Sequence, residues 1–272
     1  MSEAVVHEQG PVRVKRCRHG SFAYLTTDHF IGRSLDTYGE YSEGEVDLFR
    51  HAVRPGQTVL DIGAHIGAHT VPLAKLAGSH GRVLAFEPQR VLFQLLCANL
   101  ALNAINHAHA YQNAVGYGEA AVAMPRVDYA RLNNFGGLAV TDGEIGECEP
   151  VTQISVDSLG LDACHFIKID VEGMENEAVA GAAETIRRTR PVIYTECDRA
   201  ERAGELIQRL LGFDYRLYWH CPMLFAPDNF FKMATNVFGT LVSFNLLCLP
   251  RERPQNVPNL VEVKAPDDPR PY

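Results

Sequence analysis

The sequence predicts an α/β protein built on a mostly parallel β-sheet with helices on both faces. From about residue 57, short apolar runs alternate with helix-length periodic segments, which is the pattern of βαβ units. A turn with two glycines four residues apart, Gly63 and Gly67, joins the first run to the first helix and is typical of a nucleotide site. The 272 residues are 46% hydrophobic and 21% charged, as expected for a globular chain with one large core.

The core elements are predicted by two patterns. Strands are expected where a short apolar run is bounded by turn residues, and helices where apolar residues recur every three or four positions. In chain order, the predicted elements are a strand at 57–63, a helix at 68–76, a strand at 82–87, a helix at 90–103, a strand at 165–171, a helix at 175–189, a strand at 192–197, a helix at 199–211, and strands at 215–221 and 245–249.

Three regions differ from this core. Residues 1–50 are predicted to form an N-terminal extension that packs on a domain of residues 51–250. Between about 117 and 156, short β-like pieces and turns rich in Asn and Gly predict a small β insertion. Residues 251–272 are predicted as a proline-rich C-terminal tail, either extended or poorly ordered. Basic and apolar residues alternate at 13–19, which favours a strand with one solvated face over a phosphate-binding patch.

The charge and cysteine content argue against several classes of protein. A net charge of −8 argues against a nucleic-acid partner. The sequence has no run of 18 apolar residues and no signal-like start, so we expect a cytoplasmic protein without a membrane span. Seven scattered cysteines without a C-x-x-C pair predict reduced thiols rather than disulfides or structural zinc.

The loop after the first strand and the acid after the second indicate an adenosine-containing ligand. Glu87 stands twenty residues after Gly67 at a strand end, where its carboxylate can accept hydrogen bonds from both hydroxyls of a ribose. NAD and S-adenosylmethionine (SAM) both carry this diol. The loop lacks the G-x-G-x-x-G pattern that suits a pyrophosphate, and Asp61 adds negative charge, which favours the sulfonium of SAM. An NAD-dependent oxidoreductase and a non-catalytic nucleotide-binding fold remain alternatives.

A second group of charged residues marks a candidate catalytic site. On a strand, Lys168, Asp170 and Glu172 project to one face, and three charges on a central strand are costly unless they line a cleft. Ligands of open α/β sheets bind at the carboxyl ends of strands, so Asp170 is the first candidate. Further candidates are Glu172, Glu196 and His220. Their alternative roles are a helix N-terminal acid, a surface or capping carboxylate, and a buried histidine, respectively.

Several strings together resemble the FkbM-type SAM-dependent methyltransferases, a branch of the class I methyltransferase fold. The likeness runs from about residue 35 to residue 250, and its most specific string is K-I-D-V-E-G-x-E. The matching strings are DIGAHIGAHT (61–70), AFEPQ (85–89), ANLALN (98–103), QNAVG (112–116), NNFGG (133–137), FIKIDVEGMENEAVAGA (166–182) and RPVIYTEC (190–197). The resemblance implies a Rossmann-like sheet of seven strands, SAM as methyl donor, and O-methylation of a hydroxyl on a sugar or natural product.

The resemblance also implies roles for individual residues. The loop around the methionine part of SAM would comprise Asp61, Gly63, Ala64, His65, Gly67 and Thr70. The other implied cofactor contacts are Glu87 and Pro88 at the ribose, Asn113 and Ala114 at the adenine, and Tyr38, Glu45 and Asp170 beside them. The family usually has Asn where this chain has His65, so an imidazole replaces an amide there.

The expected reaction is an in-line displacement in which a carboxylate or histidine accepts the proton of the acceptor hydroxyl, with S-adenosylhomocysteine as the second product. Asp170 is the first candidate for this base, and Glu172, Glu196 and His220 are the alternatives. The three acids would suffice in kind for Mg²⁺, but no ligand spacing demands it, so a divalent metal is not favoured and no metal ligand is predicted. The expected partner is a small-molecule or glycan acceptor, and the oligomeric state stays open, with a homodimer as one option.

Overall fold

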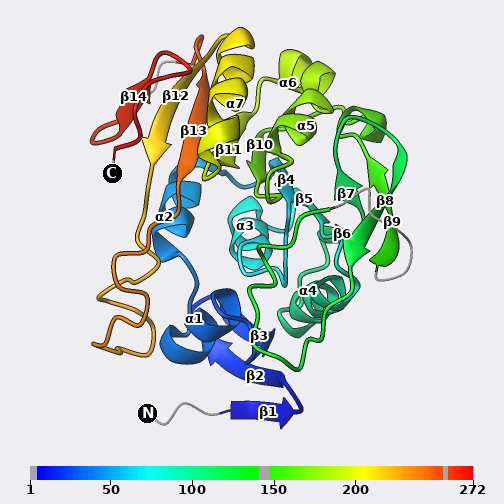
Figure 1. The fold of residues 1–272 in the computed structure, drawn as a ribbon, viewed down its shortest axis with the longest axis vertical. Helices are drawn as coiled ribbons and strands as arrows, with labels where there is room; N and C mark the ends of the chain where they lie inside the picture. The colour runs from blue at the N-terminus through cyan, green and yellow to red at the C-terminus, as the bar shows by residue number, and fades with distance from the viewer. Residues whose placement is uncertain (1–4, 141–147, 254–256, 272) are drawn as a thin grey trace.

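A mixed β-sheet of eight strands forms the centre of the molecule, with helices on both faces (Figure 1). The computed structural model describes residues 5–140, 148–253 and 257–271. Residues 1–4, 141–147, 254–256 and 272, which belong to the predicted extension, insertion and tail, lie outside the described residues. The strand order is β14-β12-β13-β11-β10-β4-β5-β6. The predicted α/β class is confirmed.

Five neighbouring strands run parallel. They are β6 (Ala108–Tyr111), β5 (Arg82–Phe86), β4 (Thr58–Ile62), β10 (Phe166–Ile169) and β11 (Val192–Glu196). The other three strands are β13 (Asn245–Pro250), β12 (Tyr215–His220) and β14 (Val261–Val263). Each of the pairs β11–β13, β13–β12 and β12–β14 is antiparallel, because the chain after β12 returns to insert β13 in the opposite direction.

The prediction of a seven-stranded, mostly parallel sheet is therefore wrong. The eighth strand, β14, comes from the proline-rich C-terminal segment, and its Val263 is buried opposite Leu217 of β12. A three-residue strand among prolines offers no apolar run of readable length, so the periodicity of the sequence does not reveal it. The direction of β13 cannot be predicted from a local pattern either, because it is set by the path of residues 221–244, which connect β12 to β13.

Alternate side chains of the strands divide the core into two clusters. On β4, Val59 packs into one cluster, and Leu60 and Ile62 pack into the other. The helices that cover the first cluster are α2 (Glu43–Ala52), α3 (Thr70–Ala77) and α4 (Arg90–Leu102). The helices that cover the second are α5 (Glu175–Ala180), α6 (Ala183–Thr189) and α7 (Ala200–Gly212). Because both faces are covered, the central strands read as nearly continuous apolar runs.

The single helix predicted at 175–189 is broken into α5 and α6 at Gly181. A Cβ at this position would lie 1.9 Å from the carbonyl oxygen of Gly116, in the insertion. The insertion itself is a three-stranded sheet followed by a short 3-10 helix. Its elements are β7 (Ala114–Val115), β8 (Ala120–Pro125), β9 (Cys148–Ile154) and η1 (Asp157–Leu159). The glycine therefore lets the insertion approach the helical layer closely.

The N-terminal extension is a second small sheet with one helix. Its elements are β1 (Val5–Gln9), β2 (Val12–Cys17), β3 (Gly20–Leu25) and α1 (Ile31–Tyr38). Two arginines of this region form ion pairs with acids of the same extension. Arg13 contacts Glu8 at 2.7 Å and Asp36 at 2.8 Å, and Arg18 contacts Glu40 at 2.6 Å. These guanidinium groups are therefore engaged within the fold.

The connection between β12 and β13, residues 221–244, is named the strap here. In Figure 1 it is the long orange loop that leaves the sheet and returns beside α1. The Tyr38 hydroxyl at the end of α1 donates a hydrogen bond to the carbonyl of Thr235 (3.0 Å) and accepts one from the N–H of Val237 (2.7 Å). Two segments almost 200 residues apart in sequence are thus joined.

All seven cysteines are free. Among the described residues, the helices are too short or too polar to cross a bilayer.

One buried amide fastens the N-terminal sheet to the core. Asn99 of α4 accepts a hydrogen bond at Oδ1 from the N–H of Ala23 (2.7 Å). Its Nδ2 donates to the carbonyls of Ala23 (3.0 Å) and Ile66 (2.7 Å). A single side chain therefore joins β3, α4 and the loop after β4.

We predict that Asn99→Ala lowers the free energy of unfolding by about 2–4 kcal/mol, because three buried backbone groups lose their partner. Urea denaturation would measure the loss. Cys97→Ala, on the exposed side of the same helix, is the matched control. Equal stability of the two variants would contradict the assigned role of Asn99.

Candidate active site

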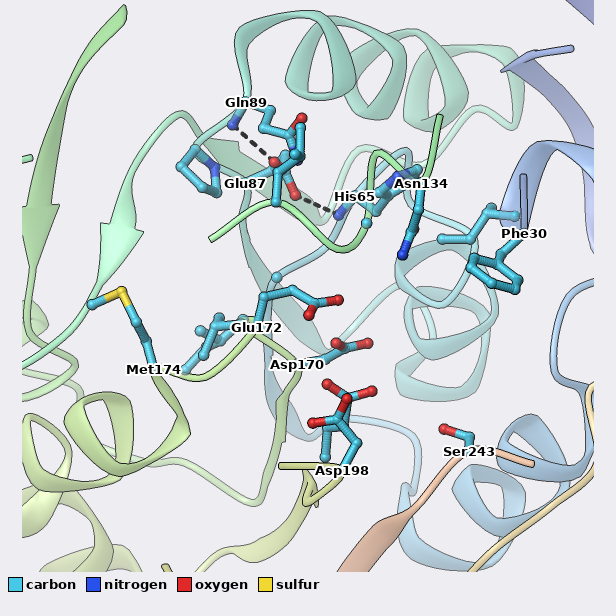
Figure 2. A pocket seen from close by; sticks show the side chains of 18 of the residues that line it. Phe30, His65, Glu87, Gln89, Asn134, Asp170, Glu172, Met174, Asp198 and Ser243 are labelled. Atoms are coloured by element: carbon cyan, nitrogen blue, oxygen red, sulfur yellow. Dashed lines mark hydrogen bonds between the residues drawn. The ribbon is translucent and has the colours of Figure 1, made fainter. Parts of the chain in front are cut away.

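A cavity of about 280 Å³ opens where the parallel strands end (Figure 2). Gly63 follows β4, Glu87 follows β5, Asp170 follows β10 and Glu196 ends β11, so the sheet brings these residues to one edge. Segments outside the sheet close the other sides. They contribute Asp28, Phe30, Ile31, Tyr41 and Glu45 from the N-terminal extension, Asn134, Gly136, Leu138 and Val140 from the insertion, and Leu224, Leu241, Val242, Ser243 and Phe244 from the strap region.

Glu87 is held in place by two backbone N–H groups. Its Oε2 accepts a hydrogen bond from the N–H of His65 (2.8 Å), and its Oε1 accepts one from the N–H of Gln89 (2.8 Å), as Figure 2 shows. Each carboxylate oxygen has a second lone pair, so Glu87 can accept two more hydrogen bonds from a ligand. Burial raises the pKa of Glu87 to about 7, although the two backbone hydrogen bonds oppose that shift.

The two glycines of the loop after β4, Gly63 and Gly67, are required by close contacts with neighbouring segments. Gly63 has φ +80, and a Cβ there would lie 1.7 Å from the carbonyl oxygen of Asp170. Only glycine allows the loop to pass this close to the end of β10. A Cβ at Gly67, which has φ +83, would lie 2.7 Å from the side chain of Leu96, so this glycine serves the packing of α4.

A buried ammonium lies beneath the cavity. Lys168 Nζ lies 3.4 Å from Asp61 Oδ1, 3.3 Å from Asp170 Oδ2 and 3.4 Å from the carbonyl oxygen of Gly63. Burial would lower the pKa of Lys168, but the neighbouring carboxylates raise it above the ordinary value. The hydroxyl of Thr70 donates to Asp61 Oδ2 (2.6 Å), so Asp61 joins β4 to the start of α3 and does not reach the cavity.

Three acids meet at the ends of β10 and β11. One carboxylate oxygen of each of Asp170, Glu172 and Glu196 lies within 4.8 Å of the others. Burial and the nearby Asp170 raise the pKa of Glu196 well above its usual range, and its Oε2 has no hydrogen-bond partner among the described residues. Burial and Asp170 raise the pKa of Glu172 to about 7, although Arg199 lies 3.2 Å away. Burial and mutual repulsion therefore make the loss of a proton from Glu172 or Glu196 less favourable than it is in water.

A fourth acid faces the cavity from α2. Glu45 is buried, and its Oε1 accepts a hydrogen bond from the Ser42 hydroxyl (2.7 Å). Ser243 of the strap also bonds its carboxylate. Burial raises the pKa of Glu45 to about 7, because these partners do not replace the lost water.

His65 and Asp28 are two further buried residues that line the cavity. His65 has φ +51, a left-handed conformation that Asn adopts more readily, and its ring is buried. His65 Nε2 lies 3.6 Å from Asp28 Oδ2, and neither ring nitrogen has a hydrogen-bond partner among the described residues. Burial lowers the pKa of His65, so the imidazole is neutral at pH 7.

The structure separates the sequence-predicted site residues into two sets. Those that line the cavity are Glu45, Gly63, His65, Glu87, Pro88, Asn113, Ala114, Asp170, Glu172 and Glu196. Those that do not line it are Tyr38, Asp61, Ala64, Gly67, Thr70 and His220. The hydroxyl of Tyr38 is used by the strap, as described above. His220 Nδ1 hydrogen-bonds with the hydroxyl of Tyr194 (2.8 Å), and burial lowers the pKa of His220 to about 4.

Several cavity residues have no signal in the sequence pattern. Asp28 comes from a turn in the N-terminal extension, and Asp198 lies in the turn after β11. The strap residues Leu224, Leu241 and Ser243 return to the site from a long connection. Of the missed residues, Tyr41 had a usable signal, because it lies between Tyr38 and Glu45, two residues that the family resemblance implied as cofactor contacts.

Comparisons with known proteins give one family match. Residues 61–217 match the model described as the methyltransferase FkbM domain. No curated protein matches the chain.

Solved structures of low sequence identity are also similar. A methyltransferase FkbM from Methylobacillus flagellatus is 18% identical with a TM-score of 0.48, over 74% of this chain and 50% of that one. The chain thus spans half the length of that protein. TYW2 from M. jannaschii, solved in complex with AdoMet, is 13% identical with a TM-score of 0.47, over 90% and 88% of the two chains. A SAM-dependent O-methyltransferase from Thermotoga maritima is 16% identical with a TM-score of 0.45, over 92% and 82%.

The raised pKa of Glu45, about 7, predicts a pH-dependent stability. Between the ordinary pKa of a glutamate and 7, the folded protein binds this proton more tightly than the unfolded chain, so stability falls as pH rises through that window. Glu45→Gln cannot ionise, and we expect it to gain about 1–3 kcal/mol over the wild type between pH 5 and pH 8.

Thermal unfolding across this pH range would measure the gain. Glu201→Gln, at an exposed position of α7, is the control and should follow the wild type at every pH. A Glu45→Gln curve that runs parallel to the wild type from pH 5 to pH 8 would disprove the assignment.

Proposed function

This chain belongs to the methyltransferase FkbM family, and on that premise we propose that it is a SAM-dependent methyltransferase. In this proposal, the methyl group is transferred to a hydroxyl group of a sugar, glycan or natural-product acceptor. The observation that carries the proposal is Glu87, a buried carboxylate preset by two backbone N–H groups, in a cavity that also holds Asp170. The first can bind an adenosine ribose, and the second can accept a proton.

The charge of the cavity supports SAM as the ligand. Its described lining contains no Lys or Arg, and it contains seven carboxylic acids: Asp28, Glu45, Glu87, Asp170, Glu172, Glu196 and Asp198. Burial raises the pKa of Glu45, Glu87 and Glu172 to about 7, so not every acid is ionised at neutral pH, but the charge that these acids do carry is negative. Such a site favours a ligand that carries a sulfonium and an ammonium, and it disfavours the two negative charges of a pyrophosphate. The same observation argues against the NAD-dependent alternative.

The cofactor contacts follow from the order of the lining residues. Glu87 binds the ribose hydroxyls with the two lone pairs that His65 and Gln89 leave free. Asn113, Ala114 and Pro88, which follow β6 and β5, form the adenine end of the cavity. The loop after β4 is fixed by three residues that do not line the cavity, namely Asp61, Gly67 and Thr70. In this proposal they support the loop and do not contact the ligand.

When bound, SAM supplies a methyl group on a sulfonium whose thioether is a good leaving group. The chain itself positions the acceptor oxygen and removes its proton. Asp170 faces the cavity, and Lys168 at 3.3 Å fixes the orientation of its carboxylate, so Asp170 is the proposed base. Glu196 lies beside Asp170, and its Oε2 has no hydrogen-bond partner among the described residues, so it can form a hydrogen bond with the acceptor hydroxyl.

The remaining candidates have smaller roles in this proposal. Glu172 lies beside Asp170 and forms an ion pair with Arg199 (3.2 Å), so it is not the proposed base. His220 points to Tyr194 and lies outside the cavity lining, so it is left out of the mechanism. The mechanism needs no metal ion.

We predict that Glu87→Ala weakens SAM binding by about 10- to 100-fold, because two hydrogen bonds to a charged group are lost. Isothermal titration calorimetry with SAM would measure this, and the melting temperature would confirm folding. Glu119→Ala, an exposed change in the insertion, is the control and should keep wild-type affinity. Wild-type affinity in Glu87→Ala would remove the ribose assignment, and binding of NAD in place of SAM would reject the proposed function.

We predict that Asp170→Asn lowers methyl transfer by on the order of 100-fold or more, because an amide cannot take the hydroxyl proton. A labelled-methyl assay on a panel of sugars, glycosides and cell extracts would measure turnover, with SAM affinity determined in parallel. Asp198→Asn makes the same change at an exposed position of the cavity and should retain most of the activity. Full turnover in Asp170→Asn would exclude it as the base, and absence of any methylated product would favour the non-catalytic alternative.

A further inference from the structure

The strap, residues 221–244, concentrates exposed apolar side chains. Met223, Phe230, Met233 and Leu241 all lie on it, and they are among the large hydrophobic residues that the described chain leaves exposed. Single apolar residues on a surface need no explanation, but of these four Leu241 lines the cavity and Met223 is bridged to another cavity residue, Val242.

The apolar surface of the strap continues into the cavity. Leu241 is 40% exposed and also lines the cavity. Met223 is bridged to Val242, and the N–H of Leu224 donates to the carbonyl of Leu241 (3.2 Å), so the two ends of the strap lie side by side. Leu224 and Val242 are cavity residues as well. The strap therefore forms an apolar wall that runs from the interior of the cavity to its rim.

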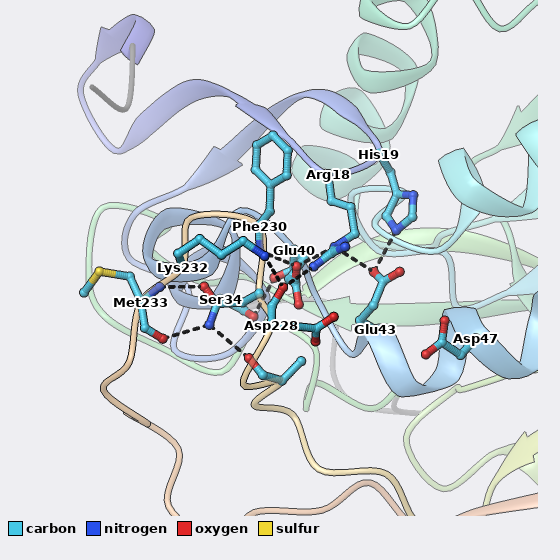
Figure 3. A network of polar contacts seen from close by, with 12 residues as sticks. Arg18, His19, Ser34, Glu40, Glu43, Asp47, Asp228, Phe230, Lys232 and Met233 are labelled. Atoms are coloured by element: carbon cyan, nitrogen blue, oxygen red, sulfur yellow. Dashed lines mark hydrogen bonds and ion pairs between the residues drawn. The ribbon is translucent and has the colours of Figure 1, made fainter. Parts of the chain in front are cut away.

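This wall is held in position by the N-terminal extension (Figure 3). Glu40 Oε2 accepts hydrogen bonds from the N–H of Phe230 (2.7 Å) and from Arg18 Nε (2.6 Å). Arg18 also donates to the carbonyl of Asp228 (2.8 Å). Together with the two bonds of Tyr38, these contacts hold the middle of the strap, residues 228–237, on the N-terminal extension. The segment that carries the wall is thus fastened on both sides of Phe230.

The wall faces the acids of the proposed reaction. Ser243 of the strap bonds Glu45, and Asp170 and Glu196 line the same cavity. A molecule that fills this side of the cavity therefore meets carboxyl groups, among them the proposed base Asp170, on one flank and aliphatic side chains on the other. A free monosaccharide, polar on every side, would leave the apolar flank without a partner.

We propose that the strap is the acceptor-binding wall and that the acceptor is a hydroxyl group carried on an apolar body, such as the sugar of an alkyl glycoside. This inference rests on the proposed function, and it narrows the acceptor from any hydroxyl compound to an amphipathic one. The hydroxyl lies against the acids, and the apolar body extends along Leu241 to the rim.

The test uses the full chain saturated with S-adenosylhomocysteine and two probes, D-glucose and n-octyl β-D-glucopyranoside below its critical micelle concentration. Calorimetry or saturation-transfer NMR should show the octyl glucoside binding at least about tenfold more tightly than glucose, because its chain buries apolar surface. Leu241→Ser should reduce this advantage by about threefold or more. Leu132→Ser makes the same change at a residue that is 70% exposed and outside the cavity lining, and it should leave both affinities unchanged.

Equal binding of the two probes, or the same response in Leu241→Ser and Leu132→Ser, would overturn the inference. It would also be overturned if Leu241 instead mediated binding to phosphatidylcholine vesicles, or dimerisation in sedimentation, without binding monomeric octyl glucoside. The binding of S-adenosylhomocysteine is measured first and separately. Its loss would count against the proposed function, whereas normal cofactor binding without discrimination between the probes would count against the strap alone.

Discussion

The charge of Lys168 is the constraint on which the site depends. Its ammonium is buried in the middle of the sheet, where an unpaired charge would cost several kcal/mol. The cost is offset because Asp61 and Asp170, from adjacent strands, lie on either side of it at 3.4 and 3.3 Å. The same ammonium lies beside the carbonyl of Gly63. One ammonium thus contacts the acid of β4, the glycine loop and the proposed base, and it holds these three groups together at the ends of the paired strands β4 and β10.

Local sequence patterns predict the central strands and the acids that follow them, because these features depend on short segments of the chain. The central strands were predictable because both of their faces are buried, so they appear as short apolar runs between turns. The carboxylates Glu87, Asp170 and Glu196 could be expected to converge because parallel strands end at the same edge of a sheet. Gly63 was found by its motif, although the reason it must be glycine is the backbone of Asp170 and not a ligand alone.

The rest depends on contacts between distant segments. Nothing near Asp28 or Leu241 shows that these residues share a cavity, since one precedes the core and the other follows most of it. The family resemblance implies Tyr38 as a cofactor contact, but its hydroxyl is hydrogen-bonded to Thr235 and Val237. The fold of the strap, and not its composition, decides which aromatic and aliphatic residues face the acids. The eighth strand was missed for a related reason, because pairing with β12 creates it.

The placement of β13 has a consequence for how the chain folds during its synthesis. This strand lies between β11 and β12 and pairs with both, yet it is made of residues 245–250, near the end of the chain. Until those residues have left the ribosome, β11 presents an unpaired edge with a buried-type apolar sequence, a surface prone to association with other chains. The sheet of the nascent protein can therefore close only after residues 245–250 have emerged, and a chaperone that shields this edge would bind it before then.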